Sequence, residues 1–314
     1  MEADHRRCLD PHRAVPPIKP STSRALRLRG LSYHLREWGD PKAPLLLMLH
    51  GWMDVSASFQ FLVDALESDW HAIAPDWRGF GQTAATAAAD CYWFPDYLAD
   101  LERILDALAE HRVDGAPIAL LGHSMGGNVA MLYAGIRPQR IRALINLEGF
   151  GLRDAAPDEA PARYARWLDE LRSPPPLRDY ASLHDVASRL IRNNPRLTTE
   201  RAAFLAPHWS RPTANGRFEL AADPAHRIVN PIGYRAMEAA ACWDRIACPV
   251  LWIEGAHSDA VRYAGGAEEV AARRGRLRTV QALRIDDAGH MLHHDQPERV
   301  AAAVEAFLNR KGAR

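Results

Sequence analysis

The sequence of 314 residues has no apolar run that approaches about 20 residues, the length that a membrane-spanning helix needs. Lysine and arginine together number 39, and so do aspartate and glutamate, so no excess charge favours nucleic acid or a membrane surface as a partner. The first 20 residues are polar and proline-rich, and they lack the apolar segment of a signal peptide. We therefore expect a cytoplasmic, soluble protein.

Cysteine is scarce, and the sequence contains no internal repeat. The four cysteines, Cys8, Cys91, Cys242 and Cys248, are scattered without the spacing of metal ligands. A zinc site is therefore not predicted, and we expect the thiols to stay reduced. Nothing else in the sequence calls for a metal ion or an organic cofactor, and nothing in it defines an oligomeric state.

Short apolar runs alternate with amphipathic segments along most of the chain. Hydrophobic residues make up 47% and charged residues 25%, as in soluble globular proteins. The predicted strands lie within 25–38 (a pair around Gly30) and at 44–49, 71–75, 118–121, 141–147, 249–253 and 277–285. The predicted helices include one capped by Ser56 or Ser58 and others at 96–112, 128–136, 234–246, 266–274 and 298–310. This alternation predicts an α/β fold with a mostly parallel sheet and helices on both faces.

The alternation breaks between residues 150 and 232. This segment holds many prolines and three helix-like patches, with no strand predicted between them. We interpret it as a helical cap inserted into an α/β core of residues 24–149 and 233–314. Residues 1–23 are predicted to form a flexible N-terminal arm.

One stretch carries a chemical signature. Residues 122–126 fit the pattern Gly-x-Ser-x-Gly between a predicted strand and a predicted helix. Such a turn is so tight that the two glycine positions leave no space for a side chain. The helix N-terminus favours negative charge beside Ser124 at the apex. Ser124 is therefore a candidate nucleophile.

A serine hydroxyl needs a base, and the base needs an acid that orients it. His290 and Asp259 each follow a predicted strand, so they should meet Ser124 at one edge of the sheet. His290 would accept the serine proton, and Asp259 would fix the imidazole tautomer. Glu148, at the end of the strand that follows the serine helix, is the competing acid.

The negative charge that develops on a carbonyl oxygen requires preorganised donors. The backbone N–H of Met125, directly after the serine, is one candidate for such an oxyanion hole. The N–H of Trp52 is the other, because Gly51 before it lets the backbone turn inward.

Several stretches together resemble the α/β-hydrolase fold, and in particular its serine hydrolase-like branch. The resemblance is carried by His-Gly-Trp-Met-Asp at 50–54 with Ser58-Phe59, by residues 122–128, by Asp76 to Gly81, and by Gly289-His290 with Gln-Pro-Glu at 296–298. It covers nearly all of the chain from Arg24 onward and is weak across the cap. Epoxide hydrolases and haloalkane dehalogenases share the fold but use an aspartate nucleophile, so Ser124 argues against both.

The resemblance implies a serine hydrolase that forms an acyl-enzyme on a small or medium carboxylic ester. In many relatives the acid lies three residues after the strand-end glycine, where this chain has Ser258, and Asp259 is one residue later. Some relatives instead take the acid from the position of Glu148. Two other functions use the same scaffold: hydrolysis of a carbon–carbon bond in a diketone-type substrate, and ligand binding by a receptor without turnover.

Other polar residues in these motifs are interpreted as structural. His50 should shape the oxyanion loop, Asp76 and Arg78 should hold the loop at 79–81, and His293 and His294 should lie at the surface or the pocket rim. His123 is expected to contribute to packing and Asp54 to stabilise a turn. His257 is expected to be a loop residue. The cap composition suggests a mainly apolar pocket of modest size, to which five tryptophans can contribute: Trp52, Trp77, Trp167, Trp209 and Trp252.

Overall fold

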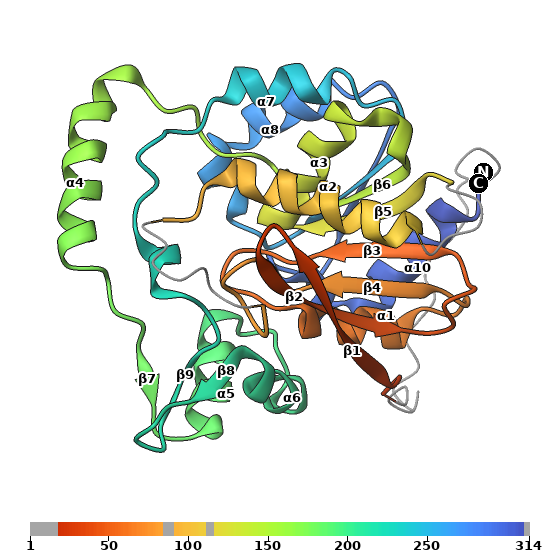
Figure 1. Cartoon of the computed structure of the whole chain (residues 1–314). Helices are drawn as coiled ribbons and strands as arrows, with labels where there is room; N and C mark the ends of the chain where they lie inside the picture. Colours follow the sequence, from red (N-terminus) through yellow and green to blue (C-terminus); the bar gives the residue numbers. More distant parts are fainter. Residues whose placement is uncertain (1–17, 84–90, 111–115, 311–314) are drawn as a thin grey trace.

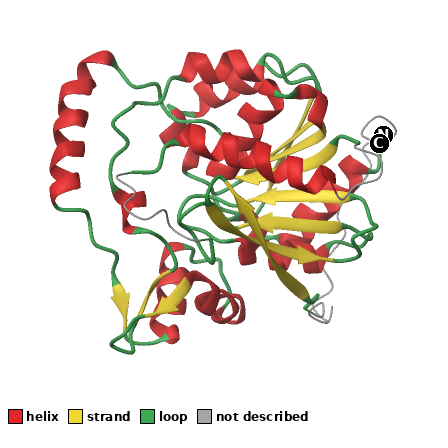
Figure 2. Ribbon diagram, viewed as in Figure 1, coloured by secondary structure: helices red, strands yellow, loops and turns green. Residues whose placement is uncertain are grey.

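A central sheet of eight strands organises the molecule (Figures 1 and 2). The computed structural model describes residues 18–83, 91–110 and 116–310. In these ranges the sheet order is β1-β2-β4-β3-β5-β6-β10-β11. β1 and β2 form an antiparallel hairpin, β2 pairs antiparallel with β4, and every later pair is parallel. The predicted mostly parallel α/β sheet is therefore confirmed.

The strand bounds follow the apolar runs of the sequence. The strands of the sheet are β1 (Ser21–Leu28), β2 (Leu31–Trp38), β3 (Leu45–Leu49), β4 (His71–Pro75), β5 (Ile118–His123), β6 (Ile141–Leu147), β10 (Val250–Gly255) and β11 (Val280–Ile285). All residues of β3 and β5 are buried, as expected of inner strands covered on both faces. β1 begins three residues before the expected start of the core, and residues 1–17 of the predicted arm lie outside the described residues.

Helices cover both faces of the sheet (Figure 1). One face packs against α2 (Phe94–Glu110), α3 (Met125–Ile136), α7 (Ala236–Trp243) and α8 (Ala267–Arg274). The other face packs against α1 (Gln60–Ala65), α9 (Leu292–Asp295) and α10 (Pro297–Leu308). The sheet is thus the middle of three layers. Among the described residues, none of these helices is both long enough and apolar enough to span a membrane.

The segment between β6 and α7 forms a separate layer beyond one end of the sheet (Figure 1). It contains α4 (Ala160–Arg172), α5 (Leu183–Asn193) and α6 (Thr199–Trp209), close to the three predicted helical patches. It also contains a small antiparallel sheet of β7 (Asp179–Tyr180), β9 (Phe218–Leu220) and β8 (Ser210–Pro212). The prediction of helices without strands was wrong here, because strands of two or three residues leave no periodic pattern.

A second local prediction was also wrong. The helix after β3 opens as a 3₁₀ turn, η1 (Ser56–Phe59), whose N-cap residue Val55 makes no side-chain cap. Ser56 and Ser58 lie inside this turn and are buried rather than capping it. The backbone N–H of Ser56 instead donates to Asp76 at 2.7 Å, and the Ser58 hydroxyl donates to Asp54.

Candidate active site

Ser124 lies at the apex of a sharp turn between β5 and α3. Its backbone has φ 52° and ψ −117°, a strained conformation for a residue with a side chain. A Cβ atom on Gly122 would lie 2.4 Å from the Gly126 carbonyl oxygen, and one on Gly126 would lie 2.1 Å from that of Leu49. Only glycine fits at these two positions. The Ser124 N–H donates to the Leu147 carbonyl at 2.8 Å, which fixes the turn against β6.

Ser124, His290 and Glu148 form a hydrogen-bonded line. The Ser124 hydroxyl lies 2.9 Å from Nε2 of His290, and Nδ1 of His290 lies 2.7 Å from Oε2 of Glu148. The Glu148 side chain is fully buried, whereas that of His290 is 35% exposed. A carboxylate can only accept, so Nδ1 carries the proton and Nε2 is free to accept the serine proton. The arrangement can therefore activate Ser124 as a nucleophile.

The turn after β6 aims Glu148 at the histidine. Glu148 has φ 58°, and the Asn146 amide side chain holds both the N–H and the carbonyl of Gly149. The Glu148 carboxylate accepts from the N–H of Gly255 at 2.7 Å through Oε1, and from the Ser258 hydroxyl through Oε2. Three donors, one from the last residue of β10 and two from the loops after β10 and β11, thus satisfy one buried carboxylate.

Asp259, the first choice for the acid, does not reach His290. Its side chain is 65% exposed and pairs with Arg262 at 2.9 Å. Asp259 is the N-cap residue of the 3₁₀ turn η5 (Ala260–Ala264), so its side chain faces solvent at the cavity wall. Asp259 is the fourth residue after Gly255, one position later than the acid of many relatives, and at this position it pairs with Arg262 instead of His290. Glu148, the competing acid in the sequence, occupies the place beside Nδ1.

Two backbone N–H groups lie where an oxyanion hole is expected. Met125 is the first residue of α3, and Trp52 follows Gly51 in the loop after β3. A Cβ on Gly51 would lie 3.2 Å from Cβ of Ser124, so this loop packs directly against the serine. In the described part of the chain, neither N–H donates to a protein acceptor. Both remain available to a ligand oxygen.

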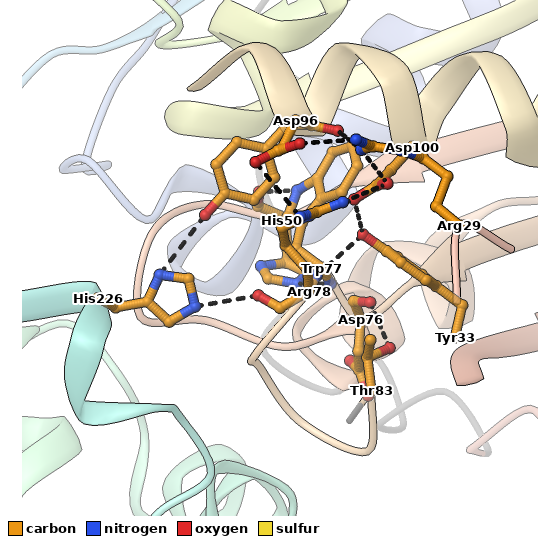
Figure 3. A network of polar contacts seen from close by, with 11 residues as sticks. Arg29, Tyr33, His50, Asp76, Trp77, Arg78, Thr83, Asp96, Asp100 and His226 are labelled. Atoms are coloured by element: carbon orange, nitrogen blue, oxygen red, sulfur yellow. Dashed lines mark hydrogen bonds and ion pairs between the residues drawn. The ribbon is translucent and has the colours of Figure 1, made fainter. Parts of the chain in front are cut away.

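His50 holds the loop that carries the Trp52 N–H, the oxyanion loop, against the loop after β4 (Figure 3). Its Nε2 accepts from the backbone N–H of Trp77 at 2.9 Å, so Nδ1 must carry the proton that it donates to the Gly51 carbonyl at 2.7 Å. The Trp77 indole N–H donates back to the His50 carbonyl. Complete burial lowers the pKa of His50 to about 4, so the ring stays neutral. This agrees with the predicted structural role.

A buried ion pair fixes the loop after β4 to α2 (Figure 3). Both oxygens of Asp100 accept hydrogen bonds from the Arg78 guanidinium, and the Tyr33 hydroxyl donates to the same carboxylate. His226, from the 3₁₀ turn η4 (Pro224–Arg227), donates through Nε2 to the Arg78 carbonyl at 3.0 Å. This network connects the inserted segment to the core. Asp100 had no sequence signal beyond its place on an amphipathic helix.

A second polar cluster lies under the serine turn. Asp54, His123 and His293 are all buried, and one ligand atom from each lies within 4.8 Å of the others. Nε2 of His123 donates to the His290 carbonyl at 2.9 Å, which leaves its Nδ1 without a partner in the described structure. Both ring nitrogens of His293 and Oδ2 of Asp54 are likewise unpartnered there. The chemistry and spacing of these atoms fit a small guest, either a water molecule or a cation.

The remaining histidines and tryptophans differ partly from expectation. His293 is fully buried rather than at the surface, while His294 is buried and contributes to the cavity wall. His257 is exposed. Among the tryptophans, Trp52 and Trp209 line the cavity, whereas Trp77 and Trp252 belong to the core.

The serine opens into a cavity of about 930 Å³ between the core and the inserted segment. Six leucines of the inserted segment line it: Leu152, Leu177, Leu190, Leu197, Leu205 and Leu220. Three arginines of the same segment also line it: Arg178, Arg189 and Arg227. The cap sequence contains arginines among its apolar residues, but it does not tell which of these side chains face the cavity.

Known proteins with similar sequences are hydrolases. The chain is 30% identical over 292 residues to a 3-hydroxybutyrate-oligomer hydrolase of Cupriavidus necator, a match that covers 89% of this chain and 93% of that protein. It is 36% identical over 114 residues to a serine hydrolase-like protein of Danio rerio. That second match covers 36% of this chain and only a third (33%) of the fish protein.

Solved structures agree on the fold. A thioesterase domain from the curacin biosynthetic pathway superposes with a TM-score of 0.80 at 23% identity, over 91% of this chain and 99% of that domain. A family model described as the alpha/beta hydrolase fold matches residues 44–297. The match spans both halves of the core and the segment between them. The chain therefore belongs to the α/β-hydrolase family and is a hydrolase.

Proposed function

We propose that this protein hydrolyses a carboxylic ester through an acyl-enzyme on Ser124, with His290 as the base and Glu148 as the acid. The observation that carries the proposal is the line from the Ser124 hydroxyl through His290 to the buried Glu148 carboxylate, with contacts of 2.9 and 2.7 Å. Both distances lie within the range that proton transfer requires.

In the first half-reaction His290 Nε2 takes the proton of Ser124 as Oγ attacks the ester carbonyl carbon. The carbonyl oxygen becomes an oxyanion, which the N–H groups of Met125 and Trp52 would stabilise. Glu148 stabilises the imidazolium that forms and keeps its own charge. The bond from the carbonyl carbon to the alcohol oxygen then breaks, and His290 gives that oxygen its proton.

In the second half-reaction water replaces the alcohol. His290 takes a proton from the water, which attacks the acyl carbon and releases the acid. The proton on His290 returns to Ser124, so the enzyme is regenerated. Each of these steps uses only groups of this chain and the solvent.

Two observations support a substrate of small or medium size. The cavity of about 930 Å³ lies within the range of small-molecule sites, and leucines line much of it. The bacterial relative is named for oligomers of 3-hydroxybutyrate, whose units are joined by carboxylic esters. We therefore place short esters of this kind first among the substrates to test.

The test compares the wild type with Ser124→Ala, using a fluorophosphonate probe and a series of p-nitrophenyl esters of increasing acyl length. We expect labelling and ester turnover in the wild type and neither in the variant, with a maximum at short or medium acyl chains. Circular dichroism should show that the variant is folded.

Other outcomes point elsewhere. Labelling without ester turnover would favour a carbon–carbon bond hydrolase, to be tested with diketone-type ring-cleavage products. No labelling of folded wild-type protein would contradict the proposal.

A further inference from the structure

The charged residues on the cavity wall are unequally distributed. The core contributes the carboxylates of Glu148 and Asp259, which are bound to His290 and Arg262 respectively. The inserted segment contributes three arginines and no aspartate or glutamate to the wall. The part of the cavity beyond the serine therefore carries positive charge that the wall does not neutralise.

These three arginines differ from most other arginines of the same segment. Arg166, Arg211 and Arg217 each form an ion pair of 2.6 to 2.8 Å with a carboxylate. Within the described residues, Arg178, Arg189 and Arg227 have no carboxylate within ion-pair distance. Arg192 and Arg196 of the segment also lack such a pair in the described structure, but they do not line the cavity. The three arginines on the cavity wall are thus available to an anionic ligand.

A short stretch of chain gathers the three arginines. The guanidinium carbons of Arg178 and Arg189 lie 5.9 and 6.0 Å from the ring centroid of Tyr180. The Arg227 guanidinium donates to the carbonyl of Pro176, two residues before Arg178. The Tyr180 ring is buried and lines the cavity, and its hydroxyl has no hydrogen-bond partner among the described residues. All three arginines therefore contact or belong to residues 176–180, and we call Arg178, Arg189 and Arg227 the arginine cluster.

The chemistry of the cluster favours a carboxylate. A guanidinium presents parallel N–H donors that match the two oxygens of a carboxylate, and such charge-assisted bonds are stronger than neutral ones. Arg178 and Arg227 are exposed and Arg189 is half-buried, so their attraction for an anion is open to screening by salt. Ser124, the three arginines and several leucines line the same cavity, so the leucine side chains can contact an alkyl chain of a bound ester.

We propose that the substrate is an ester with a free carboxylate at the end remote from the scissile bond, and that Arg178, Arg189 and Arg227 bind this carboxylate. This inference rests on the proposed function, since it places the ester at Ser124. It adds a substrate class: half-esters of dicarboxylic acids, or esters of hydroxy acids whose other end is free.

Two substrates of equal chain length test the inference. Mono-p-nitrophenyl adipate carries a carboxylate at the far end of a six-carbon chain, and p-nitrophenyl hexanoate has a methyl group there. We expect kcat/KM of the wild type to be at least tenfold higher for the adipate ester. The preference should shrink as salt rises from 20 to 500 mM, because screening weakens the attraction between charges.

The three single variants Arg178→Gln, Arg189→Gln and Arg227→Gln should each lower the ratio of the two kcat/KM values severalfold, mainly through a higher KM for the adipate ester. Arg211→Gln is the matched control, because Arg211 belongs to the same segment but pairs with Glu219 outside the cavity. It should keep the wild-type ratio. Equal kcat/KM for both esters, or a ratio that the three variants do not change, would overturn the inference while leaving ester hydrolysis intact.

Binding separates this inference from the proposed function. Calorimetry on the Ser124→Ala protein should detect monomethyl adipate but not dimethyl adipate at millimolar concentration. If the wild type neither hydrolyses esters nor takes the fluorophosphonate label, the proposed function fails and this binding experiment alone decides about the arginines. The absence of any difference between the two adipates would then overturn the inference.

Discussion

The hydroxyl of Ser258 donates to the same carboxylate oxygen of Glu148 that receives the N–H of His290. The two residues follow neighbouring parallel strands, Glu148 after β6 and Ser258 after β10. Ser258 therefore stands at the position where the family resemblance implies the acid, and the carboxylate that contacts His290 follows the neighbouring strand. The Ser258 hydroxyl donates a hydrogen bond to the Glu148 carboxylate, which we propose as the acid.

The first prediction concerns the identity of the acid. Glu148→Gln keeps the shape of the side chain but removes the charge that stabilises the imidazolium, so we expect kcat to fall by about 10³–10⁴-fold. Asp259→Asn should leave kcat within about twofold, because Asp259 is exposed and bound to Arg262. Turnover of p-nitrophenyl butyrate measures both variants, with thermal unfolding as the check on folding.

The opposite ranking would return the acid to Asp259. That result requires the loop at 256–262 to rearrange on substrate binding, since Asp259 pairs with Arg262 and His290 pairs with Glu148 in this structure. Equal losses in the two variants would likewise contradict the assignment of Glu148 alone.

The second prediction concerns Ser258. Ser258→Ala removes one donor from a buried carboxylate that keeps the Gly255 N–H, and a hydrogen bond to a charged group contributes about 1.5–3 kcal/mol. We expect kcat to fall by about one order of magnitude with KM little changed. Ser258→Thr retains the hydroxyl and should recover most of the activity. An equal loss in the threonine variant would indicate a packing effect instead.

Most of the fold could be predicted because the pattern is strong where the strands are buried. The apolar runs at 44–49 and 118–121 are wholly buried, and each predicted strand of the large sheet is present. Ser124 and His290 could be located because the glycine pattern and the strand-end histidine are local features. Their contact was expected, and they lie 2.9 Å apart.

Other features depend on distances between residues far apart in the sequence. Whether Asp259 or Glu148 contacts His290 depends on the path of the four-residue loop after β10. The pattern of apolar residues does not predict the path of such a loop. The small sheet of the inserted segment has strands of two and three residues, too short for an alternation. The inward direction of Arg189, and the burial of His293, likewise arise from tertiary packing.

The third prediction concerns the ion pair behind the oxyanion loop. Asp100→Asn removes the charged partner to which the buried Arg78 guanidinium donates two hydrogen bonds and leaves it only Asp96 at 3.3 Å, and breaking a buried pair costs about 3–5 kcal/mol. We expect the free energy of unfolding in urea to fall by about this amount. Asp106→Asn, on the same helix, is the control: its carboxylate is 38% exposed and pairs with Arg140, so its loss should cost less than about 1 kcal/mol. Equal effects would contradict the special role of Asp100.

The fourth prediction concerns the pH dependence of stability. Burial raises the pKa of Asp54 to about 7 from the ordinary value of 3.8. Between these two values the unfolded chain releases the proton that the folded protein retains, so Asp54 destabilises the fold increasingly as pH rises toward 7. The penalty is absent below pH 3.8 and constant above 7, with an upper limit of order 4 kcal/mol.

Asp54→Asn removes this penalty, because an amide does not ionise and its N–H₂ can donate to the unpartnered ring nitrogens of His123 and His293. We expect the variant to unfold several degrees above the wild type at pH 8, with a smaller difference at pH 5. Asp69→Asn, an exposed carboxylate in the loop before β4, should show no such pH-dependent difference.

A variant less stable than the wild type at pH 8 would mean that ionised Asp54 is compensated in the folded protein. The compensating group would be a cation held with His123 and His293, whose nitrogens are suitable ligands. In that case a chelator should lower the melting temperature of the wild type to that of the variant, and added Zn²⁺ should restore it. If the chelator has no effect on the wild type and the variant is the more stable protein at pH 8, no metal ion compensates the charge of ionised Asp54.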